Sequence, residues 1–221
     1  TILDKIPGSS FTNGGFIKFG SDEKLYVGTG TVSDVSHLPQ DLNSLSGKIL
    51  RLNDDGSIPD DNPFHGSPVY SLGHRNPQGM TWDNDGNLFV AEFGPEKNDE
   101  INLIQPGKNY GWPEQECSGN DDFENAVLCY DPSIEPGGIL FYSGNISDFE
   151  SSFIMASMRA TNLYQLNFEE VLSSQKSILS GIGRVRDVVQ GHDGSLYVIT
   201  SNTDGKGFPD SMDDKLLRIL K

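Results

Sequence analysis

The residues with the clearest chemical potential lie in a stretch rich in glycine, proline and asparagine, Tyr70–Gly79, which contains Arg75. It precedes an apolar segment, Asn87–Ala91, that is typical of a buried strand. A second turn, Glu92-Phe-Gly-Pro95, and two carboxylates within Asp99–Asn102 follow that strand. A guanidinium suits an anionic ligand, and carboxylate or carbonyl oxygens suit a hard metal ion. The cluster indicates a site for both; the alternative is that the glycines only make turns and that Arg75 is a solvated charge.

These pieces, in this order, closely resemble the glucose/sorbosone dehydrogenase family, quinoproteins that oxidise aldose sugars with pyrroloquinoline quinone (PQQ). The resemblance covers most of the chain. Further segments that carry it are Gln40–Asn53, Asp55–Pro59, Pro132–Pro136, Phe141–Gly144 and Arg184–Asp187. The resemblance implies a six-bladed β-propeller and the PQQ- and calcium-dependent oxidation of an aldose at its anomeric carbon to the lactone.

PQQ carries three carboxylates on a flat ring, and the planar fork of arginine pairs with carboxylates and stacks on rings. The resemblance implies that five residues contact this cofactor: Arg75, Asn76, Arg159, Arg184 and Arg186. Among them, Arg75 would polarise the quinone and is therefore the candidate catalytic residue. A random distribution of solvated charges would not be expected to place four of the few basic residues at these positions.

Calcium is the metal that the resemblance implies. Gly94 and Pro95 match the turn whose carbonyls hold the catalytic calcium in the family. Glu100 and Tyr110 match a second, structural calcium site, for which Asp121 is a possible third ligand. Carboxylate and carbonyl oxygens are the ligands that calcium prefers. Without the family, Glu100 is equally well a strand-end carboxylate and Tyr110 a core aromatic.

The chain departs from the family at the general base. Thr12 stands where the family has the histidine that accepts the sugar hydroxyl proton, and Phe16 where it has an arginine. Phe93 replaces a polar residue that contacts the cofactor. None of the four histidines, His37, His65, His74 and His192, falls at the base position. Because threonine is not a base near neutral pH, the second candidate function is a catalytically impaired propeller that binds a sugar or protein partner.

The rest of the chain predicts an all-β fold that would position these residues. Short apolar runs alternate with Asp-Gly, Asn-Gly and Pro turns, and the runs recur in the same order in four units. The central strands of the units are Lys24–Val27, Asn87–Val90, Ser152–Met155 and Ser195–Val198. This repetition favours a β-propeller of about four blades; a β-sandwich, the alternative, would lack the repeated order.

Three expectations concern the boundaries of the fold. Thr1–Ile6 is predicted to be the outer strand of a blade, and Glu169–Gln175 to form a turn or two of helix. Residues 1–221 would form a single and partial propeller domain. Because an open arc leaves sheet edges to be paired or covered, we expect self-association or further blades from a longer chain.

Composition excludes some classes of partner. The net charge of −16 argues against nucleic acid, and no apolar run has the roughly 20 residues of a membrane span. The two cysteines, Cys117 and Cys129, do not form a zinc motif. A disulfide between them would fit an extracytoplasmic (periplasmic or secreted) protein; two free buried thiols are the alternative.

Overall fold

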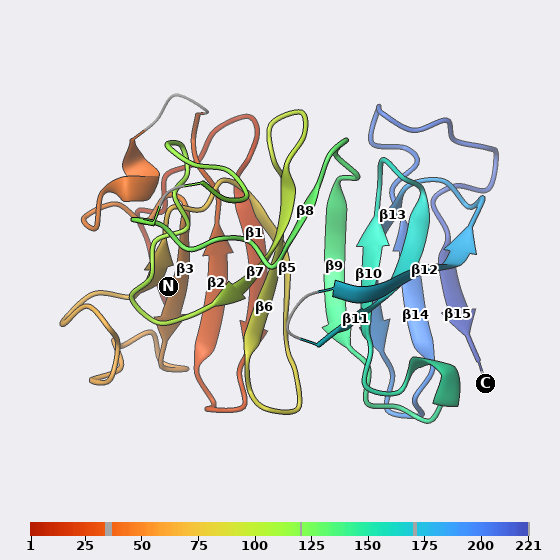
Figure 1. Cartoon of the computed structure of the whole chain (residues 1–221), viewed down its shortest axis with the longest axis horizontal. Coiled ribbons are helices and arrows are strands. Elements are labelled where there is room, and N and C mark those ends of the chain that lie inside the picture. Colours follow the sequence, from red (N-terminus) through yellow and green to blue (C-terminus); the bar gives the residue numbers. More distant parts are fainter. Residues whose placement is uncertain (34–36, 120, 170–171, 221) are drawn as a thin grey trace.

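Four antiparallel sheets, each built from consecutive strands, make up the computed structural model, which describes residues 1–33, 37–119, 121–169 and 172–220 (Figure 1). The first sheet contains β1 (Gly14–Phe19), β2 (Leu25–Thr29), β3 (Lys48–Leu52) and β4 (Val69–Leu72). The second contains β5 (Pro77–Trp82), β6 (Leu88–Glu92), β7 (Asp99–Ile104) and β8 (Leu128–Tyr130). The third contains β9 (Pro136–Phe141), β10 (Phe153–Ser157), β11 (Asn162–Phe168) and β12 (Leu172–Ser180). The fourth contains β13 (Val185–Gln190), β14 (Leu196–Thr200) and β15 (Leu216–Ile219).

The sheets are the blades of a β-propeller, as the sequence predicted, and we number them blade 1 to blade 4 in chain order. Neighbouring blades pack face to face through apolar side chains. Met80 and Ile49 lie between blades 1 and 2, Phe89 and Phe153 between blades 2 and 3, and Leu196 in the cluster between blades 3 and 4. Burial of these residues supplies the main favourable term for stacking the blades.

Glycines on the inner strands allow the blades to approach closely. A Cβ atom at Gly79 of β5 would lie 2.6 Å from the carbonyl oxygen of Gly137 in β9. A Cβ atom at Gly137 would in turn lie 2.1 Å from the carbonyl oxygen of Arg186 in β13. The backbones of three blades therefore converge at distances that only glycine permits.

The chain ends depart from the expected strands. Thr1–Ile6 forms no strand, so that expectation was wrong: Ile2 runs against Gly56 in the loop between β3 and β4, and Leu3 packs on the Leu50–Val69–Leu72 cluster. Apolar contact with the outside of blade 1 replaces strand pairing in this segment. The blade 4 sheet has three strands within the described residues and no fourth, outer strand among them.

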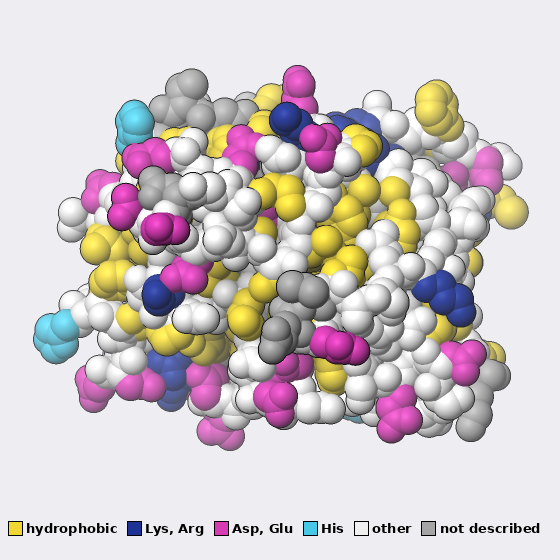
Figure 2. Space-filling view, viewed as in Figure 1, with side chains coloured by type: hydrophobic (Ala, Val, Ile, Leu, Met, Phe, Trp, Pro, Cys, Tyr) yellow, Lys and Arg dark blue, Asp and Glu magenta, His cyan; other side chains and the backbone are white. Residues whose placement is uncertain are grey.

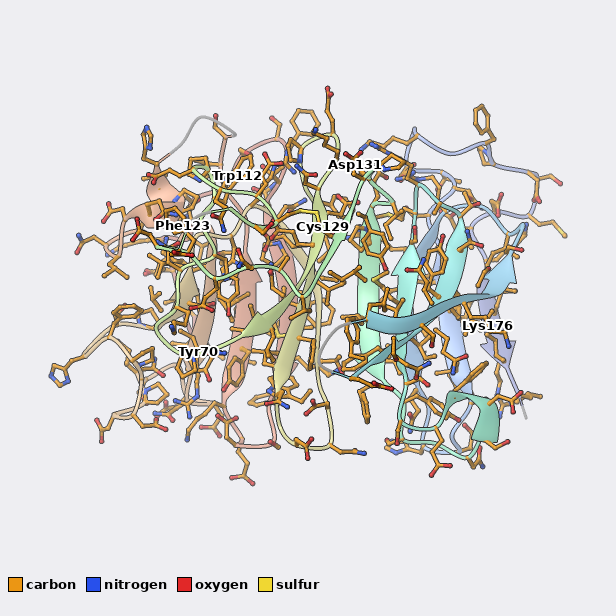
Figure 3. All side chains as sticks on the ribbon, in the orientation of Figure 1. Tyr70, Trp112, Phe123, Cys129, Asp131 and Lys176 are labelled. Carbon is orange, nitrogen blue, oxygen red and sulfur yellow. A yellow bond between two sulfur atoms is a disulfide. The ribbon has the colours of Figure 1, made fainter. Side chains whose placement is uncertain are left out.

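The helix expected at Glu169–Gln175 was also wrong. Residues 170–171 of that segment lie outside the described residues, and Leu172–Gln175 begins strand β12, which pairs antiparallel with β11. Its polar residues suit an exposed outer strand, on which Lys176 is visible in Figure 3. Helical structure among the described residues is limited to two short 3₁₀ segments, η1 (Leu38–Gln40) and η2 (Ser147–Phe149).

The disulfide between Cys117 and Cys129 is present, with Cα atoms 5.7 Å apart. It ties the long connection between β7 and β8 to β8 itself (Figure 3). No helix in the described part of the chain is both long and apolar enough to traverse a bilayer.

Apolar side chains are exposed on the two blade faces that no other blade covers. Ile17 and Phe19 of β1 are 60% and 56% exposed, and Leu216 of β15 is 71% exposed. Large exposed apolar surfaces of this kind are typical of interaction sites. Self-association, or coverage by further blades, stays a prediction.

Candidate functional site

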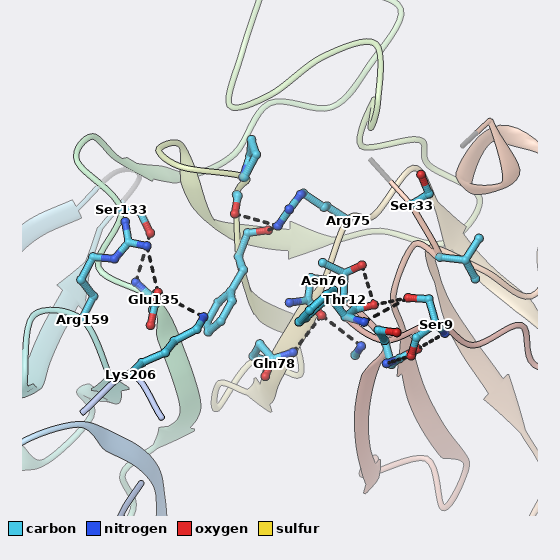
Figure 4. Close-up of a pocket in the computed structure, with 18 of the residues that line it drawn as sticks. Ser9, Thr12, Ser33, Arg75, Asn76, Gln78, Ser133, Glu135, Arg159 and Lys206 are labelled. Carbon is cyan, nitrogen blue, oxygen red and sulfur yellow. Dashed lines mark hydrogen bonds and ion pairs between the residues drawn. The ribbon is translucent and has the colours of Figure 1, made fainter. Parts of the chain in front are cut away.

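A cavity of about 850 Å³ lies at one end of the blades and is lined by loops from all four of them (Figure 4). Thr12 comes from the segment before β1, and Arg75 and Asn76 from the connection between β4 and β5. Other lining residues include Gln78, Phe93, Gly94, Pro95, Ser133, Glu135, Arg159, Arg186 and Lys206. The structure thus brings together at one cavity most of the cofactor residues that the resemblance implied.

The cavity is strongly positive although the protein is acidic. Four cations line it, Arg75, Arg159, Arg186 and Lys206, and Glu135 is the one carboxylate among its described lining residues, a formal charge of +3. The whole chain carries −16. Many acidic side chains lie over the loops at the ends of the blades (Figure 2). A concave site with an excess of one sign of charge attracts ligands of the opposite sign, so this lining favours anionic ligands.

Buried hydrogen bonds fix the position of Arg75. Its backbone N–H donates to Oε1 of Glu92 at 2.7 Å, and Oε2 of Glu92 lies 3.0 Å from Nδ1 of His74. The guanidinium donates to the carbonyls of Phe93 and Gly94 at 3.1 and 2.7 Å, and lies 5.3 Å from the centre of the Trp112 ring. Arg75 therefore keeps a defined orientation at the cavity wall.

Asn76 occupies the floor beside Arg75. Its Oδ1 accepts hydrogen bonds from the backbone N–H of Gly14 at 3.0 Å and from Nε2 of Gln78 at 2.9 Å. Asn76 thereby joins the start of blade 1 to the start of blade 2, and it places the Gln78 amide at the cavity.

Asp99 is a buried anchor for two loops of the site. Its Oδ1 accepts the backbone N–H of Gly94 at 2.9 Å. Its Oδ2 accepts Oγ of Ser133 and the backbone N–H groups of Ile134 and Glu135 at 2.7 to 2.8 Å. The sequence grouped Asp99 with the ligand-binding charges, but the structure gives this carboxylate the task of holding the cavity wall.

The basic residues of blades 3 and 4 meet at Glu135 (Figure 4). Arg159 and Arg184 each donate to its carboxylate, at 2.9 and 2.8 Å, and Nζ of Lys206 lies 3.8 Å away. Arg184 is 7% exposed, also pairs with Asp204, and is not among the lining residues. Four of the five expected cofactor residues thus face the cavity, while Arg184 lies behind Glu135.

Thr12, which the resemblance matched to the base position of the family, lines the cavity. Its Oγ1 donates to the carbonyls of Phe11 and Thr31 at 2.8 and 2.7 Å. The backbone φ of Thr12 is +56°, a conformation that β-branched residues rarely adopt. Phe93 also lines this cavity, whereas Phe16 lines a separate one of about 200 Å³ and packs against the apolar cluster between blades 1 and 2.

Glu100 and Tyr110 line a small cavity of about 10 Å³, together with Glu92, Asn98 and Glu116. Burial and the neighbouring Glu92 raise the pKa of Glu100 to about 8. Oδ1 of Asn102, whose amide donates to Glu100, has no hydrogen-bond partner among the described residues. The cavity is of one-atom size, and the carboxylates of Glu92 and Glu100 are ligands of the kind that suits a cation, but Arg75 also lines it and already brings a positive charge there.

The ligand set differs in detail from the one expected. The hydroxyl of Tyr110 donates to the carbonyl of Leu103 at 2.6 Å, so its side chain points away from Glu100. Asp121 is exposed and does not line the small cavity. Within residues 1–33, 37–119, 121–169 and 172–220, no three His, Cys, Asp or Glu side chains form a metal-binding group. Backbone carbonyls would have to complete either calcium site.

Sequence reasoning missed Glu135 and Lys206. Glu135 lies in the Pro132–Pro136 segment that carries the resemblance, yet nothing in its local sequence indicates that three cations surround it. Lys206 lies in the long connection between β14 and β15, with no motif to single it out. Only the packing of blade 3 beside blade 4 brings the two together.

Comparison with known proteins identifies the family of the chain. The fold and the cavity define a β-propeller with a cationic cavity at one end of its blades. Residues 1–218 match the family described as glucose/sorbosone dehydrogenase. The chain belongs to the glucose/sorbosone dehydrogenase family.

Three relatives illustrate the match. The PQQ-bound aldose sugar dehydrogenase of Streptomyces coelicolor has a TM-score of 0.88 and 42% identity, over 97% of this chain and 63% of that one. The aldose sugar dehydrogenase of Escherichia coli K12 is 32% identical over 93% of this chain and 62% of its own length. Quinoprotein glucose dehydrogenase B of Acinetobacter calcoaceticus is 41% identical over 51% of this chain and 28% of its length. This chain spans less than two thirds of each relative.

The role of Asp99 leads to a stability prediction. We expect Asp99→Asn to lower the free energy of unfolding by roughly 2–4 kcal/mol, because hydrogen bonds to a charged acceptor contribute about 1.5–3 kcal/mol each. An asparagine would also turn an NH₂ group toward an N–H donor on one side. Urea denaturation measures the change. Asp131→Asn, a charge change at an exposed position in the next loop, serves as the control, and equal stability of the two variants would contradict the anchoring role.

Proposed function

We propose that the cationic cavity binds PQQ and that the protein oxidises an aldose sugar at its anomeric carbon to the lactone. The observation that carries this proposal is the formal charge of +3 on a cavity of about 850 Å³ within an acidic chain. PQQ carries three carboxylates on a planar ring and fits this donor set in charge and in kind. When bound, it would supply an ortho-quinone that accepts two electrons from the sugar in the form of a hydride.

The residues of the chain would divide the task of binding. Arg159, Arg186 and Lys206 face the cavity as carboxylate partners, and Arg184 supports them through Glu135. Arg75 would polarise the quinone from the opposite wall, where Asn76 and Gln78 present amides. Side chains held by buried hydrogen bonds, such as Arg75, bind without much further loss of conformational freedom.

Oxidation of the sugar also requires a group that accepts its hydroxyl proton. Thr12 has no basic group, and no histidine is among the described lining residues. His74 is fully buried between Ser71 and Glu92, out of contact with the cavity. The absence of a base commonly reduces the rate by about a hundred- to ten-thousand-fold. This observation favours the second candidate, a catalytically impaired propeller that binds a sugar or protein partner.

Calcium belongs to the same proposal. The Gly94–Pro95 turn would offer carbonyl oxygens to a calcium ion beside the cofactor, in competition with the Arg75 guanidinium that now contacts the Gly94 carbonyl. Glu100, with the backbone carbonyl of Tyr110, would hold the structural ion, and Asp121 is a candidate only through a movement of its loop. We also propose an extracytoplasmic location, which the Cys117–Cys129 disulfide supports.

Cofactor binding is the first test. Titration of PQQ into the calcium-loaded protein should give a saturable absorbance change, and Arg186→Gln should weaken binding about ten- to a hundred-fold, since it removes a charge-assisted hydrogen bond. Arg218→Gln removes the same charge on β15, from a residue paired with Asp193, and should bind like the wild type. No saturable binding, or equal losses in both variants, would refute the proposal.

Restoring the base is the second test. Thr12→His should bind PQQ as the wild type does and oxidise aldoses at least tenfold faster, because an imidazole accepts protons near neutral pH. Histidine also tolerates the left-handed backbone better than threonine. Ser10→His places an imidazole elsewhere on the same cavity and should give no gain. Rapid oxidation by the unmodified protein would mean that another group is the base.

Calcium removal is the third test. A chelator should lower the melting temperature by about 5–10 °C, because calcium at about 100 times its dissociation constant stabilises by about 2.7 kcal/mol. Glu100→Gln should abolish this response, whereas Glu114→Gln, an exposed acid on the neighbouring loop, should retain it. A melting curve that the chelator leaves unchanged would eliminate the structural calcium site.

A further inference from the structure

Glu135 is the one carboxylate among the described residues that line the cationic cavity. The residue is 6% exposed and its carboxylate contacts Arg159, Arg184 and Lys206. It therefore occupies the centre of the cation cluster that an anionic ligand would have to reach. Neither the established family membership nor the proposed function requires a negative charge at that place.

The three cations differ in how much they depend on Glu135. Arg184 is enclosed and has a second carboxylate partner, Asp204, at 2.8 Å. The side chains of Arg159 and Lys206 are 49% and 67% exposed and line the cavity. Arg159 has one further contact, a weak one of 3.4 Å to the carbonyl of Glu96. Glu135 thus partners two accessible cations that a ligand carboxylate would also pair with.

The carboxylate of Glu135 has little freedom to move aside. Its backbone N–H is bound to Asp99, and its φ is +52°. Although burial alone would raise its pKa, hydrogen bonding and charge from Arg184 hold the pKa of Glu135 below its usual value.

We propose that Glu135 is a specificity-determining residue, a built-in counter-anion that competes with ligand carboxylates for Arg159 and Lys206 and lowers the affinity of the cavity for polyanions. This inference rests on the proposed function in taking PQQ as the physiological ligand. The competing possibility is that Glu135 merely orients Arg159. Competition is favoured because the flexible side chains of Arg159 and Lys206 remain half exposed, and because Arg184 stays compensated by Asp204 without Glu135.

The test measures affinity for two planar tricarboxylates, PQQ and benzene-1,3,5-tricarboxylate, in Glu135→Gln. We expect about tenfold tighter binding of both, the effect of removing a like charge roughly 6 Å away at an effective dielectric constant of about 40. The gain should disappear in the Glu135→Gln/Arg159→Gln double variant. Glu96→Gln removes the same charge from an exposed position at the rim and should change affinity less than twofold.

The outcomes separate this inference from the proposed function. Tighter binding of the benzene tricarboxylate without any binding of PQQ would leave the inference standing and refute PQQ as the ligand. Weaker or unchanged binding of both by Glu135→Gln would overturn the competition. If Glu135→Gln does not fold, Lys206→Met leaves the arginine pairs intact and should weaken tricarboxylate binding about tenfold; unchanged binding would overturn the inference.

Discussion

The candidate site depends on the burial of Asp99. A carboxylate removed from water costs several kcal/mol unless hydrogen bonds satisfy it, and Asp99 is fully buried with four donors around it. These donors come from the turn after β6 and from the segment before β9. Neither loop can move without leaving the charge uncompensated, so the two walls of the cavity are fixed relative to each other.

Glu92 has the corresponding task on the other side of the cavity. Its carboxylate bridges the His74 ring and the Arg75 backbone, and it closes the small cavity that Glu100 also lines. Glu92 on β6 and Asp99 on the neighbouring strand β7 thus hold the walls of the cationic cavity, and Glu92 also lines the candidate cation site. Because both project from paired strands, the site is built on the most rigid part of the blade.

The acidic residues of the chain lie largely in its turns, whereas cationic side chains line its cavity. Aspartates in the hairpin turns accept hydrogen bonds from backbone N–H groups: Asp83 from that of Asn87, and Asp193 from that of Ser195. The turns that make a propeller therefore also make its surface acidic. Since the Debye length is about 8 Å at physiological ionic strength, the cations inside the cavity dominate the potential that a ligand experiences there.

Sequence patterns predicted the strands whose conformation depends on neighbouring residues in the chain. Alternating apolar residues and Asp-Gly turns predicted the central strand of each of the four blades, and the resemblance predicted that Arg75, Asn76, Arg159 and Arg186 meet at one cavity. The segments Thr1–Ile6 and Glu169–Gln175 were wrong because packing against a distant blade, or pairing with β11, decides their conformation. The position of Arg184 behind Glu135 depends on contacts between blades 3 and 4, which no single segment encodes.

Two residues that line the cavity, Thr12 and Glu135, share a left-handed backbone without being glycine, with φ of +56° and +52°. Such conformations persist only where the surroundings impose them. At Thr12 the carbonyl packs against Gly30, where a Cβ atom would be 1.9 Å away; at Glu135 the N–H is bound to Asp99. The scaffold thus sets the backbone at both positions independently of the side chain. Substitutions there can change the chemistry of the cavity, by adding a base or a charge, while the propeller that holds it stays the same.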